Sequence, residues 1–366
     1  MKPANTGPTV DPEVRVDVGQ LWQLTTDCFQ GIGIPGEDAA AVADVLIDAN
    51  IRAMESHGFQ RVPIYMRRVL AGLAGGTQWV RYTHEQGVFC RMDAGNALGP
   101  AAALKALHKC ISISSQHGLG MVAVSNSTHF GAAGYYARRA ARAGQVSVIM
   151  SNAVKRMAPY GASQPFFGTN PLAIGVPLGE HPDFVLDMSS SVIAQGKITR
   201  ARDLGESLPE GVALDSRGRP TTDPQEALAG CLLPVGGPKG SGLAMAISML
   251  CVLLAGADTD DQMASLYNDF ERRQNTGHVF ITVDIGLLGL RAETRALDDM
   301  VDRLLGLPQD QTSPPLKYPG QDTALAAATR RRHGLPVHRG ELLRVAEVCR
   351  VAGLDDVASR AEALAG

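Results

Sequence analysis

The segment Ser56–Tyr65 spaces a histidine, an arginine and a tyrosine four residues apart, as His57, Arg61 and Tyr65. Residues four apart share one face of a helix, so these side chains would lie side by side. An imidazole can donate or accept a proton near neutral pH, and a guanidinium can bind a carboxylate through two parallel N–H bonds. The alternative is an ordinary surface helix in which Ser56 caps the N-terminus and the charges are solvated.

Two further segments carry polar side chains in loops. The stretch Asn126–Gly131 contains His129 and follows an apolar strand, which is where α/β proteins gather ligand groups. The same histidine could instead cap the next helix or belong to the core. The stretch Phe167–Ala173 contains Thr169 and Asn170, and its Gly-Thr-Asn-Pro sequence is typical of a tight turn that leads into a strand.

Two segments contain groups that could bind phosphate or ribose oxygens. Asp187–Ser191 supplies a carboxylate and hydroxyls after a short strand, although its serines could equally cap a helix. Gly236–Gly242 supplies bare backbone N–H groups, Lys239 and the start of an apolar helix, which together indicate an anion cradle. This second segment does not have the Walker spacing.

Residues 31–36 read Gly-Ile-Gly-Ile-Pro-Gly and formally match the dinucleotide-binding pattern G-x-G-x-x-G. That fingerprint requires a preceding strand, whereas residues 18–29 and 37–53 both have helical spacing. We therefore expect a helix-turn-helix joint here, with Gly31 as the cap of the first helix. Any dinucleotide site in this chain must use a different fold.

The elements that would position these groups follow from periodicity. Helical spacing predicts helices at about 60–72, 99–116, 132–143 and 294–305, with more at the C-terminal end. Apolar runs predict strands at 87–93, 120–124, 146–150, 185–188 and 278–284. The apolar stretch 243–257 is shorter than the roughly 18 residues of a membrane span, so we expect a buried helix and no membrane partner.

The composition excludes several functions. With 45% hydrophobic residues and a net charge of -3 over 366 residues, the chain has a sizeable core and no basic surplus for nucleic acid. The six cysteines form no C-x-x-C pair, which indicates reduced thiols and a cytoplasmic location. No H-E-x-x-H or similar ligand cluster is present, so we expect no metal and no metal-dependent hydrolase.

Taken in order, these segments resemble the non-Rossmann malate/L-lactate dehydrogenase family, which includes ureidoglycolate and sulfolactate dehydrogenases, diketogulonate reductase and ketimine reductases. The resemblance extends from about Val18 to about Leu354. It rests on five motifs: Ser56-His57-Gly58 with Arg61, Gly168–Pro171, Asp187–Ser189 with Gly196-Lys197, Gly237–Gly240, and Tyr318–Gln321. It implies an α/β (α+β) class and a non-Rossmann NAD(P)-binding fold with a mixed, mainly antiparallel central sheet and helices from both chain ends.

The resemblance also implies roles for individual residues. His57 would be the general acid or base, Ser56 its hydrogen-bond partner, and His129 a second acid/base or orienting group. Substrate contacts would come from Arg61, Tyr65, Thr169 and Asn170. Cofactor contacts would come from Asp187, Met188, Ser189, Lys239, Gly240, Gly320, Gln321 and Asp322.

The expected reaction is hydride transfer between NAD(P)H and C2 of a small 2-keto or 2-hydroxy acid or a cyclic imino acid. The family implies a homodimer whose subunits share the active site. The alternative is a catalytically silent member that acts as a binding protein, against which the intact set of His57, Arg61 and His129 argues.

One segment departs from the family pattern. After Ser151-Asn152, where relatives carry small hydroxyl or acidic residues, the chain reads Ala153-Val154-Lys155-Arg156. Cations near a cofactor favour the 2′-phosphate of NADPH, so we expect a slight preference for NADPH. The alternative is that Lys155 and Arg156 project into solvent.

The expected organisation has four parts. Residues 1–17 would be a flexible tail, and an N-terminal helical region at 18–85 would pack with C-terminal helices at 323–366. Residues 86–130 and 243–322 would form the central sheet domain, and residues 131–242 the cofactor-binding domain.

Overall fold

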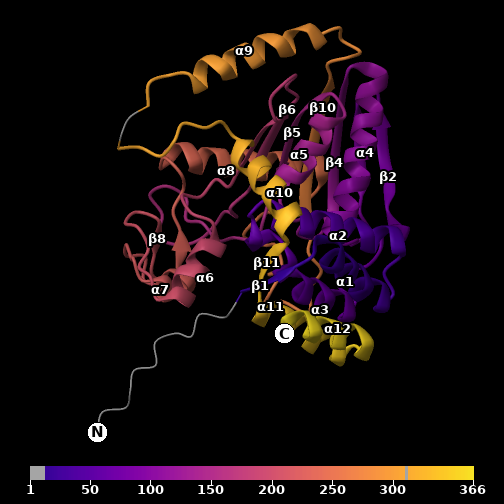
Figure 1. Cartoon of the computed structure of the whole chain (residues 1–366), viewed down its shortest axis with the longest axis vertical. Helices are drawn as coiled ribbons and strands as arrows, with labels where there is room; N and C mark the ends of the chain where they lie inside the picture. The colour runs from indigo at the N-terminus through magenta and orange to yellow at the C-terminus, as the bar shows by residue number, and fades with distance from the viewer. Residues whose placement is uncertain (1–12, 310–311) are drawn as a thin grey trace.

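In the computed structural model, which describes residues 13–309 and 312–366, a seven-stranded sheet crosses the molecule (Figure 1). Its order is β2-β3-β4-β10-β5-β6-β7. The strands β3 and β4 are parallel, and the other neighbours in this sheet are antiparallel, which confirms the predicted mixed sheet. The strands are β2 (Arg81–Gln86), β3 (Phe89–Asp93), β4 (Leu119–Ser127), β5 (Gln145–Ser151), β6 (Leu172–Val176), β7 (Phe184–Met188) and β10 (Thr276–Asp284).

Two helices cover one face of the sheet. The helix α4 (Gly99–His117) packs on β4 and β10, and α5 (Ala133–Arg142) packs on β5, β6 and β7. Their alanine-rich faces bury an apolar core that includes Phe280 of the central strand. Small side chains let a helix lie close to a sheet, which explains the many alanines in both helices.

Helices from both ends of the chain form a second core. The helices α1 (Val18–Gly31), α2 (Gly36–Ile51) and α3 (Val62–Leu70) share one apolar cluster with α10 (Gln321–His333), α11 (Arg339–Val351) and α12 (Asp355–Ala365). Figure 1 shows the indigo and yellow helices together. This pairing joins segments about as far apart in sequence as the chain allows.

The predicted tail at 1–17 is wrong in part. Residues 13–16 form β1 (Glu13–Val16), which pairs antiparallel with β11 (Leu335–His338) and ties the two chain ends together. Residues 1–12 lie outside the described residues.

The predicted cofactor-binding domain at 131–242 is not a separate sheet domain, because β5, β6 and β7 belong to the central sheet and only the short pair β8–β9 forms a sheet within these residues. Its last part forms a small lobe beside the sheet, with α6 (Gln195–Leu204), β8 (Ala213–Leu214), α7 (Pro224–Ala229) and β9 (Cys231–Leu232) around a separate apolar cluster (Figure 1). The helix α9 (Thr294–Leu305) follows the central strand β10 and matches the predicted helix.

The apolar helix predicted to be buried is only partly so. It begins at Pro238, as α8 (Pro238–Leu250), and continues through a wider turn, Cys251–Ala255. Over Pro238–Ala255 the mean hydropathy is 1.5 and 33% is buried, so by length and composition this one helix could cross a membrane. One face of the helix packs on the sheet, and the other leaves Met245, Met249 and Leu253 exposed.

Two smaller predictions are confirmed. Residues 31–36 join α1 to α2 through a tight turn, and the one strand before them among the described residues, β1, is separated from them by α1. The predicted cap at Gly31 is wrong by one residue: Gly31 is the last residue of α1, Ile32 caps the helix, and Gly33 supplies the left-handed backbone of the turn. All six cysteines are buried and free.

Candidate active site

The turn that carries His57 is held against α2. Two short 3-10 turns, Glu55–His57 and Phe59–Arg61, lead into α3, and Pro63 lies in the first turn of that helix. The Phe59 N–H donates to Asn50 Oδ1 over 2.6 Å. A Cβ on Gly58 would lie 2.0 Å from the same oxygen, so this close approach requires glycine.

The His57 ring has one nitrogen engaged. Its Nδ1 lies 2.9 Å from Ser56 Oγ, and no described residue hydrogen-bonds to its Nε2. Burial, and then the Arg61 cation, lower the pKa of His57 to about 3. The imidazole is therefore neutral at neutral pH in the free protein, which is the form that can accept a proton.

The Arg61 guanidinium is fixed from one side only. Its Nε donates to the Ser56 carbonyl over 2.7 Å, and its Cζ lies 5.6 Å from the centre of the Tyr267 ring. No described residue accepts a hydrogen bond from its two terminal nitrogens. A guanidinium anchored through Nε and stacked on an aromatic ring leaves its outer N–H groups free for a carboxylate.

His129 lies beside His57, with ring centroids 5.7 Å apart. The Gly131 N–H donates to His129 Nδ1 over 3.3 Å, and the Tyr65 hydroxyl lies 2.5 Å from the same nitrogen. Because Nδ1 accepts from a backbone N–H, the neutral ring carries its proton on Nε2. Burial, then Arg61 and His57, hold the pKa of His129 well below its usual range.

A buried histidine supports the loop that carries His129. His278 on β10 stacks on Phe130 with centroids 4.4 Å apart, and its two ring nitrogens lie 2.8 Å from Ser127 Oγ and 2.9 Å from Ser151 Oγ. His278 was not among the residues expected from the sequence, although a histidine inside an apolar strand is an available signal. Its hydrogen bonds fix β4, β5 and β10 where the loop that carries His129 leaves the sheet.

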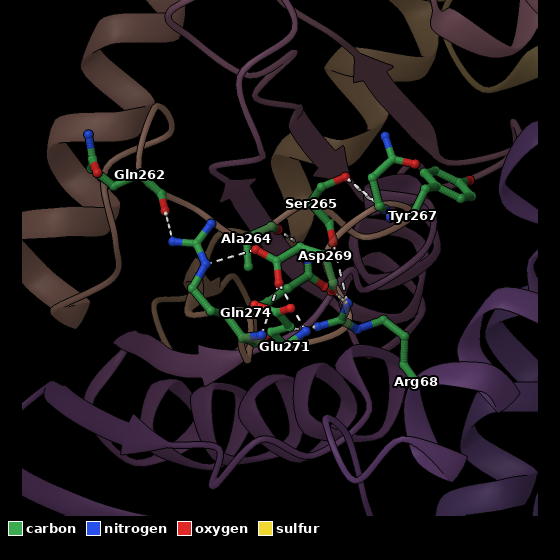
Figure 2. A network of polar contacts seen from close by, with 10 residues as sticks. Arg68, Gln262, Ala264, Ser265, Tyr267, Asp269, Glu271 and Gln274 are labelled. Atoms are coloured by element: carbon green, nitrogen blue, oxygen red, sulfur yellow. Dashed lines mark hydrogen bonds and ion pairs between the residues drawn. The ribbon is translucent and has the colours of Figure 1, made fainter.

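The loop after α8 contributes Tyr267, which was not expected from the sequence either. Figure 2 shows how Arg68 of α3 holds this loop from below. The Arg68 guanidinium donates to the carbonyls of Ser265, Asp269 and Arg272 over 3.3, 2.6 and 3.0 Å, and it is 1% exposed. The same helix therefore positions Arg61 and, through Arg68, the tyrosine stacked on it.

The small lobe reaches the site through α6. A Cβ on Gly196 would lie 2.5 Å from Ser56 Cβ, so the start of α6 packs directly on the turn that carries His57. The neighbouring Lys197 is exposed. The motif Gly196-Lys197 thus lies beside Ser56-His57, although the two are far apart in sequence.

The predicted cofactor segments meet around β7. Asp187 Oδ2 accepts from the Gly134 N–H at the start of α5 over 2.8 Å, and Oδ1 has no described partner. Burial raises the pKa of Asp187, and the Gly134 N–H and Arg138 oppose that rise. Gly320 precedes α10 and lies against β7, where the Val185 N–H donates to the Pro319 carbonyl.

Some of the neighbouring residues predicted to contact the cofactor already have hydrogen-bond or ion-pair partners within the protein. Met188 and Ser189 follow Asp187, and Ser189 Oγ lies 3.0 Å from Ser191 Oγ rather than at a helix start. The Gln321 amide oxygen accepts from the Tyr318 N–H over 3.4 Å. Asp322 is paired with Lys317 at 2.8 Å.

The Thr169–Asn170 turn is built into the protein. The Thr169 carbonyl accepts from Ser190, next to the Asp187 segment. The Asn170 side chain is fully buried, donates to Asp260 and Ala244, and accepts from the Ala153 N–H. Its hydrogen bonds are satisfied internally, so the geometry does not support Asn170 as a substrate ligand.

The predicted anion cradle at Gly236–Gly242 is not open. The N–H groups of Gly237, Lys239, Gly240 and Ser241 donate to carbonyls of the same loop. Gly240 is buried against Val235, and Lys239 is exposed. What is left for a ligand at this end of α8 is the Lys239 side chain and the N–H of the exposed Gly236.

Lys155 and Arg156, the two cations in the segment that departs from the family pattern, have different surroundings. Arg156 donates to the carbonyls of Ala227, Leu228 and Gly230, at the C-terminal end of α7. A cation there satisfies orphan carbonyls and complements the helix dipole, so Arg156 is committed to the small lobe. The Lys155 side chain is exposed.

The chain matches the family model of malate/L-lactate dehydrogenases over residues 16–345. It is 33% identical to the L-sulfolactate dehydrogenase of Methanocaldococcus jannaschii over 91% of this chain and 96% of that protein. It is 35% identical to the (2R)-3-sulfolactate dehydrogenase (NADP(+)) of Chromohalobacter salexigens, over 74% of this chain and 80% of that one. It is also 35% identical to the ureidoglycolate dehydrogenase (NAD(+)) of Escherichia coli K12, over 74% of this chain and 77% of that protein.

Solved structures agree. The sulfolactate dehydrogenase of M. jannaschii superposes with a TM-score of 0.86 at 32% identity, over 94% of this chain and 98% of that one. The delta1-piperideine-2-carboxylate reductase of Pseudomonas syringae superposes with a TM-score of 0.83 at 29% identity, over 91% of this chain and 99% of that one. The chain therefore belongs to the malate/L-lactate dehydrogenase family and is a dehydrogenase that works with a nicotinamide cofactor.

Proposed function

We propose that the protein transfers a hydride between NAD(P)H and C2 of a small 2-keto or 2-hydroxy acid or a cyclic imino acid, with His57 as the general acid or base. The observation that carries this proposal is the Arg61 guanidinium, anchored through Nε and otherwise unpaired, beside His57 and His129. An α-acid offers a carboxylate for Arg61 and a reacting oxygen or nitrogen one carbon away for an imidazole.

The cofactor supplies or accepts the hydride, and the protein's task is orientation and proton transfer. The residues present suit such a cofactor, because Asp187 keeps one carboxylate oxygen free to accept from a ribose hydroxyl. In the oxidation direction the neutral His57 accepts the hydroxyl proton of the substrate. In the reduction direction a substrate carboxylate on Arg61 offsets the cation that helps to lower the pKa of His57, and so favours the protonated acid.

We also propose that the enzyme is a cytoplasmic homodimer with a slight preference for NADPH. The exposed apolar face of α8 supports a second copy, and the buried free thiols support a reducing compartment. Relatives are named for either NAD(+) or NADP(+), so the cofactor must be measured.

The test is turnover with a panel of α-acids and both forms of each cofactor. The 2-keto acids and cyclic imino acids are assayed with NADH and NADPH, and the 2-hydroxy acids with NAD+ and NADP+. Turnover of at least one α-acid class, lost on removal of its carboxylate, supports the proposal. A protein that binds cofactor and α-acids but turns none over would be the silent binding protein instead.

A further inference from the structure

A pocket of about 400 Å³ lies between α2, α5, β7 and α10, away from the histidine pair. Four arginines line it: Arg52, Arg138, Arg142 and Arg331. Gly320 and Val185 lie in the same lining, so the pocket adjoins the β7 segment that ends in Asp187.

Two of the arginines form a buried floor. Arg52 and Arg138 are 4% and 8% exposed, and both pair with the single carboxylate of Asp48. Arg52 also donates to the Thr323 carbonyl over 3.3 Å. Burying two guanidinium groups on one carboxylate is costly unless a further anion is available.

The other two arginines lie on the solvent-exposed side of the pocket. Arg142 and Arg331 are exposed, and neither has a carboxylate partner among the described residues. The lining contains one acid, Asp183, so with Asp48 the four cations face two carboxylates. Asp187 lies close enough to Arg138 to act on it electrostatically, but it is held by Gly134.

The arginines act on one another across the pocket. Burial lowers the pKa of Arg52; Asp48 opposes this, while Arg142 and Arg331 lower it further. Several cations around one cavity repel one another and give the cavity a positive electrostatic potential. A bound dianion would offset that repulsion.

We propose that this pocket binds the 2′-phosphate of NADPH, with Arg142 and Arg331 as the residues that read it. The inference rests on the proposed function and names the part of the chain that would select the cofactor. A phosphate monoester carries close to two negative charges at neutral pH, which matches the excess of two cations, and guanidinium forks suit its oxygens. Each phosphate of the cofactor's pyrophosphate carries only one negative charge.

The test uses two probes that differ only in the 2′-phosphate, adenosine 2′,5′-bisphosphate and 5′-AMP, measured by calorimetry at low ionic strength. The parent should bind the bisphosphate at least about tenfold more tightly, since charge-assisted contacts are strong. The double variant Arg142→Ala, Arg331→Ala should lose that preference while its affinity for NADH, read from nicotinamide fluorescence, stays within about twofold of the parent.

The matched control is Arg139→Ala, Arg332→Ala, which removes one exposed arginine from each of the same helices outside the pocket lining. It should behave as the parent. If the double variant weakens both probes equally, the pocket binds a different phosphate of the cofactor and the 2′ assignment is overturned. If neither probe changes, the pocket binds no phosphate. Failure of the parent to bind NADH and NADPH would instead refute the proposed function.

Discussion

The rings of His57 and His129 stack with centroids 5.7 Å apart, and each has its Nδ1 held by a neighbouring hydroxyl, of Ser56 and Tyr65. The charge on one ring disfavours charge on the other, and Arg61 disfavours both. The pair therefore carries at most one positive charge, that is, one proton beyond the single N–H of each neutral ring, near neutral pH. A substrate proton accepted by one ring excludes protonation of the other.

Replacing His57 tests the proton-transfer role. The variant His57→Ala should lower kcat by at least ~100-fold, because a positioned acid or base contributes about that much, with cofactor affinity nearly unchanged. Steady-state kinetics and nicotinamide fluorescence measure the two quantities. Tyr65→Phe should cost less, since its hydroxyl only orients His129. Near-normal turnover by His57→Ala would transfer the role to His129.

Arg61 tests the carboxylate contact. Arg61→Lys should lower kcat/KM by about tenfold or more, because an ammonium cannot supply two parallel N–H bonds or the stack on Tyr267. The loss should be smaller for substrate analogues without the carboxylate. Arg67→Lys, at an exposed position of the same helix, is the control and should be silent. Equal losses with and without the carboxylate would give Arg61 a structural role.

Arg68 tests whether α3 positions the Tyr267 loop. Arg68→Lys cannot reach three carbonyls, so hydrogen exchange at residues 262–272 should quicken and KM should rise several-fold, with a smaller effect on kcat. Tyr267→Ala should raise KM without quickening exchange elsewhere in the loop. Unchanged exchange in Arg68→Lys would show that the loop is held by its own turns, such as the Asp269–Arg272 pair.

Much of the fold could be predicted because it is encoded locally. The joint at 31–36 has its glycines and proline where helices end and begin, and the strand at Thr276–Asp284 is an apolar run. The strand Arg81–Gln86 was missed because it is an exposed polar edge strand with no apolar alternation. The helix at Gln195–Leu204 was missed because its sequence is mainly polar, with only Ile198 and Ala201 buried.

The site was predictable where a motif is contiguous. Ser56, His57, Arg61 and Tyr65 lie within ten residues, and their proximity follows from a turn and a helix. Tyr267 and the arginine pocket were not predictable, because Arg61 with Tyr267, and Arg142 with Arg331, meet only through tertiary packing. Arg156 was misread for the same reason, since the carbonyls it binds lie more than seventy residues away.

His278 predicts a pH dependence of stability. Burial lowers its pKa to about 3, so between pH 6.5 and 3 the unfolded chain takes up a proton that the folded protein does not. The free energy of unfolding should therefore fall as the pH falls, by about 2 kcal/mol from this residue between pH 7 and pH 5. Urea unfolding of His278→Gln should show a fall smaller by that amount. His84→Gln, on the exposed β2, should match the parent. Equal slopes for all three proteins would contradict the assignment.

The exposed apolar face of α8 tests the homodimer. Met245, Met249 and Leu253 are 44%, 56% and 79% exposed, on a helix whose other face packs on the sheet. A contiguous apolar face of this kind is usually covered, and a second copy of the chain is the proposed partner. The parent should sediment as a dimer, whereas Met249→Asp, Leu253→Asp should sediment as a monomer with at least ~100-fold lower turnover if the proposed dimer shares its active site between subunits. Val351→Asp, at an 81% exposed position on α11, is the control and should remain an active dimer. A dimeric α8 variant would place the interface elsewhere, and a fully active monomer would show that one chain completes the site alone.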